Sequence, residues 1–347
     1  MKKALIRLSL ASLLLIIIGG ITSYIAYQQF STWFSSENSE LTSNQRFTVV
    51  KGASLRRVAA ELHNKGWLAH PRVFEYLARA NGATDIKAGN YVLYANESPE
   101  AMLARFVSGE VELHRIALVE GKTLKQWLSA LNGASKLAAV APATAATVVD
   151  ALSLERSNPE GLFLPDTYTY AEGDSALSIL RLAYARMQEE LDVLWQDRAK
   201  DLPINSPYEA LILASIVEKE TSIAAERNKI AGVFIRRLNK GMKLQTDPTI
   251  IYGMGDSYKG NIRRKDLRAK NPYNTYFIDG LPPTPIAMPS KESIEAALNP
   301  DMSGSALFFV AKGDGTHKFS TTYEEHKKAV KDFQLKRRSD YRSTPSK

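Results

Sequence analysis

Hydrophobic residues change their spacing along the chain, and the first clear pattern is a continuous apolar stretch. Leu8 to Tyr27 carries no charged residue, and these twenty residues would span about 30 Å as a helix, the thickness of a bilayer core. Lys2, Lys3 and Arg7 precede the stretch, and no basic residue follows until Arg46. Because positive charge favours the cytoplasmic side, this asymmetry predicts a cytoplasmic N-terminus and an external remainder.

A cleaved signal peptide is the alternative interpretation of this stretch. Its apolar length exceeds the about 7–15 residues of a signal-peptide core, and no clear Ala-X-Ala site follows it. We therefore predict a retained single-pass anchor over 8–27, after a cytoplasmic segment over 1–7. The polar segment 28–45 is predicted to be a linker that lifts the folded part off the membrane.

Two later segments share one pattern at an offset of 69 residues, 50–62 and 119–131. Each contains the end of a β-branched strand, a Gly turn, a Ser or Thr at the N-cap and an amphipathic helix. This opening resembles that of LysM-like glycan-binding modules. We predict a LysM-like subdomain over 46–112, and a second βα unit with an Ala-rich connector over 113–157. A repeated scaffold without glycan binding is the equal alternative.

An apolar run over 210–217 predicts a buried helix that begins at Pro207 and carries Glu218 at its end. At about 100° per residue, Glu218 shares the apolar face, whereas Glu220 points the other way. Partial desolvation favours the protonated form of a carboxyl group, so Glu218 is a candidate proton donor for glycosidic bond cleavage. A structural ion pair with a basic neighbour is the alternative.

Other elements surround this helix in the predicted fold. Long helices are expected over 175–200 and 224–240, from an apolar stripe in the first and a Gly C-cap after the second. A short helix is expected over 293–298, and the Asp-Gly pair within 312–320 predicts a hairpin turn. The loops between these elements are rich in Pro, Asn and Tyr, which predicts rigid turns that position polar groups, or else loops stiffened for stability.

Composition narrows the function classes. The chain has 347 residues, a formal net charge of +8 and no cysteine. The charge suits an acidic polymer or a lipid surface, but no basic motif with interleaved aromatic residues predicts nucleic-acid binding. The basic clusters at 259–270 and 327–347 are typical of solvated surface. His317 and His326 fit no tight metal-ligand spacing, so neither a metal nor a cofactor is expected.

Several sequence blocks occur in an order and spacing that resembles the YceG-like family, endolytic murein transglycosylases of the MltG type. The blocks lie at 214–220, 241–249, 271–275, 280–286 and 313–319. The resemblance covers Phe47 to the C-terminus together with the single anchor. It places the catalytic glutamate of the family at Glu218.

The resemblance implies a reaction and a location. Family members cleave MurNAc-β-1,4-GlcNAc bonds within peptidoglycan strands and leave 1,6-anhydro-MurNAc ends, which terminates nascent strands beside the synthases of the inner membrane. A catalytic domain over 158–340 is expected in the periplasm, followed by a C-terminal tail over 341–347. Motif position assigns sugar binding to five residues: Gln245, Asn271, Tyr273, Asn274 and Thr275.

The predicted fold class is α+β, with a transmembrane helix, a LysM-like βα module and a mixed catalytic domain. An all-helical goose-lysozyme-like fold is not expected, because the chain from Tyr252 onward is rich in strand and loop signals. Two alternatives to the lyase stay open. One is a muramidase in which Asp247 is the second carboxylate beside Glu218. The other is a membrane-tethered glycan-binding scaffold. Glu220 is expected to tune Glu218 by repulsion or to bind backbone amides.

Overall fold

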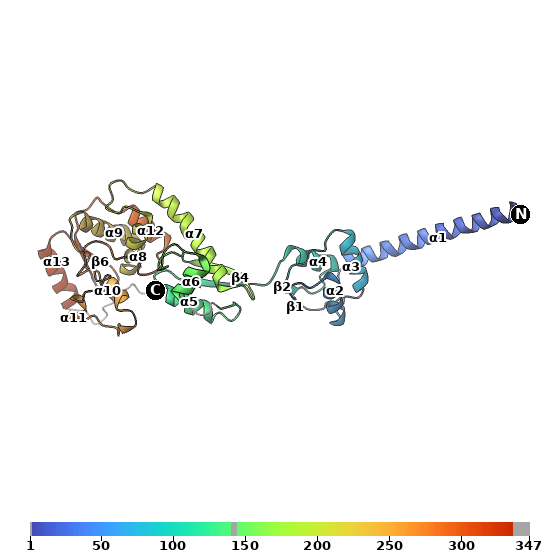
Figure 1. Cartoon of the computed structure of the whole chain (residues 1–347), viewed down its shortest axis with the longest axis horizontal. Helices are drawn as coiled ribbons and strands as arrows, with labels where there is room; N and C mark the ends of the chain where they lie inside the picture. The colour runs from blue at the N-terminus through green and yellow to red at the C-terminus, as the bar shows by residue number, and fades with distance from the viewer. Residues whose placement is uncertain (1, 140–143, 336–347) are drawn as a thin grey trace. The chain divides into compact units, whose positions relative to one another are not determined.

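The chain forms two compact units, Met1–His114 and Arg115–Lys347, which we call the N-terminal and the C-terminal unit (Figure 1). The computed structural model describes residues 2–139 and 144–335. The predicted tail over 341–347 lies outside the described residues.

Helix α1 (Lys2–Ser35) runs from the apolar stretch into the N-terminal unit without a break. Residues 10–35 are long and apolar enough to cross a membrane, by length and composition. Phe34 is only 3% exposed and its ring lies 6.0 Å from that of Phe74, and Leu41 is 1% exposed. The prediction of a free linker over 28–45 is therefore wrong, because this segment is helical at first and then packs into the core of the unit.

A two-stranded antiparallel sheet lies in the N-terminal unit, with Gln45 opposite Leu93 and Val49 opposite Gly89. Its core is rich in aromatic side chains, including Phe47, Tyr91 and Phe106. The strands and the helices that pack with them are β1 (Gln45–Val49), β2 (Gly89–Leu93), α2 (Leu55–Asn64), α3 (Pro71–Ala80) and α4 (Pro99–Ser108).

The predicted repeat is confirmed in its local structure. Ser54 caps α2 by accepting from the N–H of Arg57, and Thr123 caps α5 (Leu124–Gly133) by accepting from the N–H of Gln126. Before the two caps, Gly52 and Gly121 have φ of 79° and 67°. This left-handed conformation costs glycine little, and it turns the chain from strand to helix in both copies. The first copy lies in the N-terminal unit and the second in the C-terminal unit.

The C-terminal unit combines helices with two small sheets, which confirms the mixed α+β class. Its strands are β3 (Leu113–Leu118), which starts at the unit boundary and pairs with β4 (Asp166–Ala171), and β5 (Phe308–Ala311), which forms an antiparallel hairpin with β6 (His317–Ser320). Its helices, besides α5, are α6 (Ala145–Leu152), α7 (Ala176–Gln196), α8 (Pro207–Glu220), α9 (Ala224–Asn239), α10 (Asp247–Met254), α11 (Arg264–Leu267), α12 (Lys291–Leu298) and α13 (Tyr323–Val330), with short helical turns η1 (Gly255–Ser257) and η2 (Lys331–Leu335).

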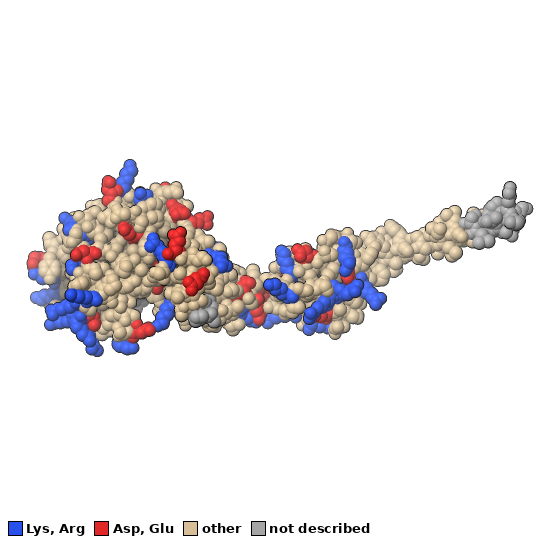
Figure 2. Space-filling model, in the orientation of Figure 1, with Lys and Arg blue, Asp and Glu red and all other residues tan. Residues whose placement is uncertain are grey.

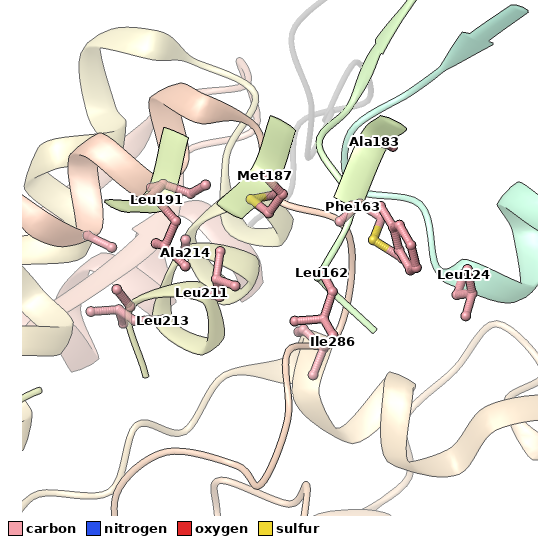
Figure 3. Close-up of a cluster of buried hydrophobic side chains, with 14 of the residues drawn as sticks. Leu124, Leu162, Phe163, Ala183, Met187, Leu191, Leu211, Leu213, Ala214 and Ile286 are labelled. Carbon is pink, nitrogen blue, oxygen red and sulfur yellow. The ribbon is translucent and has the colours of Figure 1, made fainter. Parts of the chain in front are cut away.

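Helix α8 is the centre of this unit. All its residues from 210 to 217 are buried, as the apolar run predicts. Figure 3 shows side chains of α7 and α8 converging with Leu162, Phe163 and Ile286. Because α8 is enclosed on all sides, the carboxylates at its C-terminal end are attached to a rigid support.

The chain from Tyr252 onward starts inside a helix, since α10 covers 247–254, and then consists mostly of loops and short helices up to the β5–β6 hairpin. Pro248 occupies the first turn of α10, where its fixed φ suits a helix and its missing N–H has no partner to lose. Thr249 and Ile250 are buried, so tertiary packing outweighs the β-branched character of this segment.

Candidate active site

Glu218 is half-buried at the C-terminal end of α8, and one of its oxygens is firmly held. Oε2 accepts hydrogen bonds from Ser290 N at 3.1 Å, Ser290 Oγ at 2.5 Å and Ser293 Oγ at 2.6 Å. Ser290 is the N-cap of α12, so the carboxyl group lies at the positive end of that helix. Among residues 2–139 and 144–335, no group donates to Oε1. The two oxygens thus differ: Oε2 is held by three donors, whereas Oε1 has no donor among the described residues.

The backbone of Gly121 lies directly beside the side chain of Glu218. A Cβ placed on Gly121 would lie 3.8 Å from Glu218 Cγ and 4.0 Å from Oε1. The backbone of Gly121 is fixed by its N–H, which donates to Met288 O at 2.9 Å, and by its carbonyl, which accepts from Lys219 Nζ at 3.0 Å. The second copy of the repeat therefore contributes to the surroundings of Glu218, a link that no local sequence pattern shows.

A cavity of about 680 Å³ lies at the end of α8; Lys219 and Glu220 line it, and Glu218 is not among its lining residues. It brings together three residues singled out from the sequence, namely Glu220, Gln245 and Asp247, and adds Lys219 and Tyr276. The β5–β6 hairpin and α13 supply a largely aromatic wall on another side. A concave site with a few polar groups and aromatic walls is typical of small-ligand and sugar binding.

Glu220 is one of the titratable groups that line this cavity. Burial raises its pKa to about 7; the charge of Asp247 acts in the same direction, and the hydroxyl of Thr246 and the charge of Arg237 oppose it. Thr246 Oγ1 donates to Glu220 Oε1. The partner is thus a hydroxyl group and not the backbone amides considered from the sequence. A carboxyl group that holds a proton near neutral pH can donate a hydrogen bond to a sugar oxygen.

Gln245 has strained backbone geometry. Its φ is 51°, which non-glycine residues seldom adopt, and its N–H donates to Thr275 O at 3.1 Å. Next to it, Asp247 Oδ1 accepts from Tyr276 OH at 2.8 Å. Burial, helped by Asp247, raises the pKa of Tyr276, so the phenol stays protonated. Strain of this kind concentrates at functional sites, where the surrounding structure holds it in place.

Two of the predicted sugar ligands are internal. Asn274 and Thr275 are 1% and 0% exposed, so the prediction that they contact sugar directly is wrong. Asn274 Nδ2 donates to three carbonyl oxygens of the 266–269 turn at 2.8–3.2 Å. Thr275 Oγ1 accepts from Thr246 N at 3.0 Å. Their role is to fix the loops that present Gln245.

Asn271 and Tyr273 are half-buried and also make internal bonds. Asn271 Nδ2 donates to Gly253 O at 3.0 Å, and Asn271 Oδ1 accepts from Tyr273 N at 2.8 Å. The hydroxyl of Tyr273 shares a 2.9 Å hydrogen bond with Thr284 Oγ1. These bonds hold the loop against α10, and sugar contact by the two residues stays a prediction.

Glu160 is a buried acid that is not among the residues predicted from the sequence. It is 5% exposed, and its Oε1 accepts from Leu124 N at 2.9 Å while its Oε2 accepts from Tyr252 OH at 3.2 Å. Burial raises the pKa of Glu160 to about 7, against the lowering effect of both hydrogen bonds. Through these two hydrogen bonds, Glu160 links the start of α5 to α10. The bonded residue of α5, Leu124, lies three residues after Gly121. A lone acid inside the apolar, turn-rich segment 159–165 is the signal that could have identified it.

The two histidines named from the sequence have structural partners. His317 Nδ1 lies 2.7 Å from Glu226 Oε2, and the ring of His326 stacks on Phe308 with centroids 5.1 Å apart. Within the described part of the chain, no group of three or more His, Cys, Asp and Glu side chains is arranged to hold a metal ion.

The chain is similar to known proteins over most of its length. Residues 47–332 match the YceG-like family. An endolytic murein transglycosylase of Bacillus subtilis (strain 168) is 31% identical over 311 residues, which are 84% of this chain and 85% of that protein. A second protein of that name, from Streptococcus pneumoniae R6, is 28% identical over 316 residues, 81% of this chain and 57% of that one.

A solved structure extends the agreement to the fold. A protein from Listeria monocytogenes, described as yceG-like, superposes with a TM-score of 0.51 at 30% sequence identity. The superposition covers 82% of this chain and 98% of that one. The chain therefore belongs to the YceG-like family.

Proposed function

We propose that this protein is a membrane-anchored endolytic lytic transglycosylase of peptidoglycan. Its relatives in Bacillus subtilis and Streptococcus pneumoniae are named endolytic murein transglycosylases. The observation that carries the proposal is the divided carboxyl group of Glu218, whose Oε2 is held by Ser290 and Ser293 while Oε1 has no partner in the described residues. An oriented carboxyl with one available oxygen suits general acid and base catalysis.

One carboxyl group suffices for the proposed reaction. Glu218 donates a proton from Oε1 to the glycosidic oxygen of a MurNAc-β-1,4-GlcNAc bond, and the bond from that oxygen to C1 of MurNAc breaks. The ionised Glu218 then takes the proton of the C6 hydroxyl, and O6 bonds to C1. The products are a new GlcNAc hydroxyl and a 1,6-anhydro-MurNAc end, with no water consumed. This outcome departs from the two-carboxylate glycosidase pattern.

The adjoining cavity supplies the sugar contacts in this proposal. Gln245 and Asp247 offer hydrogen bonds to hydroxyl and N-acetyl groups, and Tyr276 offers an aromatic surface. Glu220, with its pKa raised to about 7 by burial, donates or accepts as the sugar requires. Cleavage within a strand needs a cavity open to continuing sugars on both sides of the scissile bond.

A muramidase that uses Asp247 as the second carboxylate is the competing function. It is favoured by the position of Asp247, which lines the cavity and is exposed enough to meet a water molecule. Water would then replace O6 as the group that bonds to C1, and the product would be a reducing MurNAc end.

The anchor follows from helix α1. Within residues 10–35 it holds a stretch long and apolar enough for a single membrane span. We propose an orientation with the N-terminus in the cytoplasm and both units in the periplasm, beside the inner membrane, where nascent strands emerge from the synthases. Termination of glycan strand elongation is then the cellular role.

The decisive experiment compares wild type with Glu218→Gln and Asp247→Asn on nascent, uncrosslinked glycan strands, with products identified by mass spectrometry. We expect anhydro ends from wild type and from Asp247→Asn, and loss of at least about 100-fold in rate for Glu218→Gln. Glu189→Gln, at an exposed position on α7, is the matched control and should retain full activity. Undiminished cleavage by Glu218→Gln would overturn the proposal, and reducing ends would favour the muramidase.

A further inference from the structure

A groove rich in arginine lies between α2 and α3 of the N-terminal unit, outside the site described above. Its volume is about 620 Å³, and its charged lining consists of Arg56, Arg72, Arg79 and Glu75. Tyr76, which is 64% exposed, lies at the same groove. Three guanidinium groups around one carboxylate give the groove a surplus of positive charge.

Glu75, the single acidic residue of the groove, already pairs with two of the arginines. Glu75 Oε2 accepts from Arg56 Nε at 3.2 Å, and Glu75 Oε1 accepts from an amino group of Arg79 at 2.8 Å. Arg72 forms no ion pair with any described residue. Guanidinium groups bind phosphate oxygens in a two-pronged geometry, so an arginine without a partner beside two others is suited to a phosphate group.

Helix α1 brings this unit close to the membrane. The helix enters the unit unbroken, and the rings of Phe30 and Trp33 lie 5.5 Å and 5.0 Å from that of His70, the N-cap of α3. From Tyr27, at the end of the uncharged stretch, to Trp33 the helix rises about 9 Å. A lipid headgroup layer is about 5–8 Å thick. The first residues of α3, including Arg72, are therefore at the height of the headgroups or just above them.

Exposed aromatic residues lie on α1 near the height of the lipid headgroups. Tyr24, Tyr27 and Phe30 are 63%, 50% and 36% exposed. Tyrosine is enriched where a membrane helix crosses the headgroup layer. Lys and Arg side chains are visible on this unit around the end of α1 (Figure 2).

We propose that the α2–α3 groove binds the phosphate groups of anionic phospholipids on the outer face of the membrane. Arg72 is the principal ligand, with Arg79 and Arg56 beside it. Binding would hold the N-terminal unit against the lipid surface in addition to the span itself. The inference rests on the proposed membrane span and is independent of the transglycosylase activity.

The test uses the full chain in detergent micelles with added phosphatidylglycerol or phosphatidylcholine, and counts retained lipids by native mass spectrometry. We expect wild type to retain phosphatidylglycerol and not phosphatidylcholine. Arg72→Gln should lower the retained fraction at least about fivefold, and Arg72→Gln/Arg79→Gln further. Arg57→Gln is the matched control, because Arg57 lies on α2, pairs with Glu61 and does not line the groove.

Each outcome decides the proposal. Equal retention of both lipids by wild type, or unchanged phosphatidylglycerol retention by Arg72→Gln, would overturn it. If thermal melting shows that Arg72→Gln does not fold, the two-lipid comparison on wild type decides alone. Extraction of native membranes with alkaline carbonate tests the span separately: release of wild type would reject the anchor, whereas retention in the membrane with no lipid preference would reject only the groove.

Discussion

Ser293 Oγ lies 2.6 Å from Glu218 Oε2, although the two residues are 75 positions apart in the chain. Ser293 belongs to the first turn of α12 and is fully buried, so the hydroxyl has no water to compete for it. Together with Ser290, it determines which of the two carboxyl oxygens is available. The orientation of the proposed acid is therefore a property of the α8–α12 packing.

Ser293→Ala should slow catalysis without unfolding the protein. A hydrogen bond to a charged group contributes about 1.5–3 kcal/mol, so we expect kcat to fall about 10- to 100-fold. Ser303→Ala is a matched control, since Ser303 Oγ donates to the Asp301 carboxylate on the surface. Steady-state rates and melting temperatures of the two variants would be compared. An unchanged kcat for Ser293→Ala would show that this bond does not orient the reacting group.

Gly121→Ala should damage the site more than it damages the fold. Its φ of 67° makes any side chain unfavourable by about 1–2 kcal/mol, and the new methyl group would occupy the space beside Glu218, in van der Waals contact 3.8 Å from Cγ and 4.0 Å from Oε1. Gly52→Ala is the matched control, because its φ is 79° and a Cβ there meets no atom within 4 Å. Both variants should lose similar stability in urea unfolding, and only Gly121→Ala should also lose activity. Equal activity losses would contradict the assignment of Gly121 to the site.

Glu160→Gln should change how stability depends on pH. The folded pKa of Glu160 is raised by burial to about 7 from 4.5, so the folded state binds the proton more tightly than the unfolded chain. The protonated group therefore favours folding below pH 4.5, and this contribution declines as pH rises to about 7. Since Gln does not titrate, we expect Glu160→Gln to gain up to about 3 kcal/mol on wild type between pH 5 and 8.

The measurement for Glu160 is urea unfolding of both proteins at several pH values. Tyr252→Phe keeps the carboxyl group and removes the hydroxyl that lowers the pKa of Glu160, so it should retain the pH dependence and extend it to higher pH. Parallel stability curves for wild type and Glu160→Gln would show that this carboxyl does not titrate in that range.

Gln245→Gly and Gln245→Ala should separate strain from binding. Both remove the side chain, so we expect equal loss in kcat/KM if Gln245 contacts sugar. Only glycine relieves the positive φ of 51°, so Gln245→Gly should be more stable than Gln245→Ala by about 1 kcal/mol. Enzyme kinetics and urea unfolding on the pair check both statements. Activity at the wild-type level in either variant would remove Gln245 from the sugar site.

Local patterns were sufficient for most elements of the fold. Helices α7 and α8 begin at Ala176 and Pro207, and the Asp-Gly turn joins β5 to β6, as the sequence predicts to within a residue. Caps, apolar periodicity and turn residues act over a few positions, so they can be read without knowing the fold. The segment 28–45 was misjudged because polar composition does not reveal that Phe34 and Leu41 enter a core.

The sequence by itself determined the apolar span, the repeated βα opening and the position of Glu218 at the end of a buried helix. Only the tertiary structure decided which oxygen of Glu218 is available, that Gly121 stands beside it, and that Asn274 and Thr275 are internal. It also placed Glu160 between α5 and α10. The physical reason is that burial and hydrogen-bond partners depend on segments distant in the chain, which local spacing cannot report.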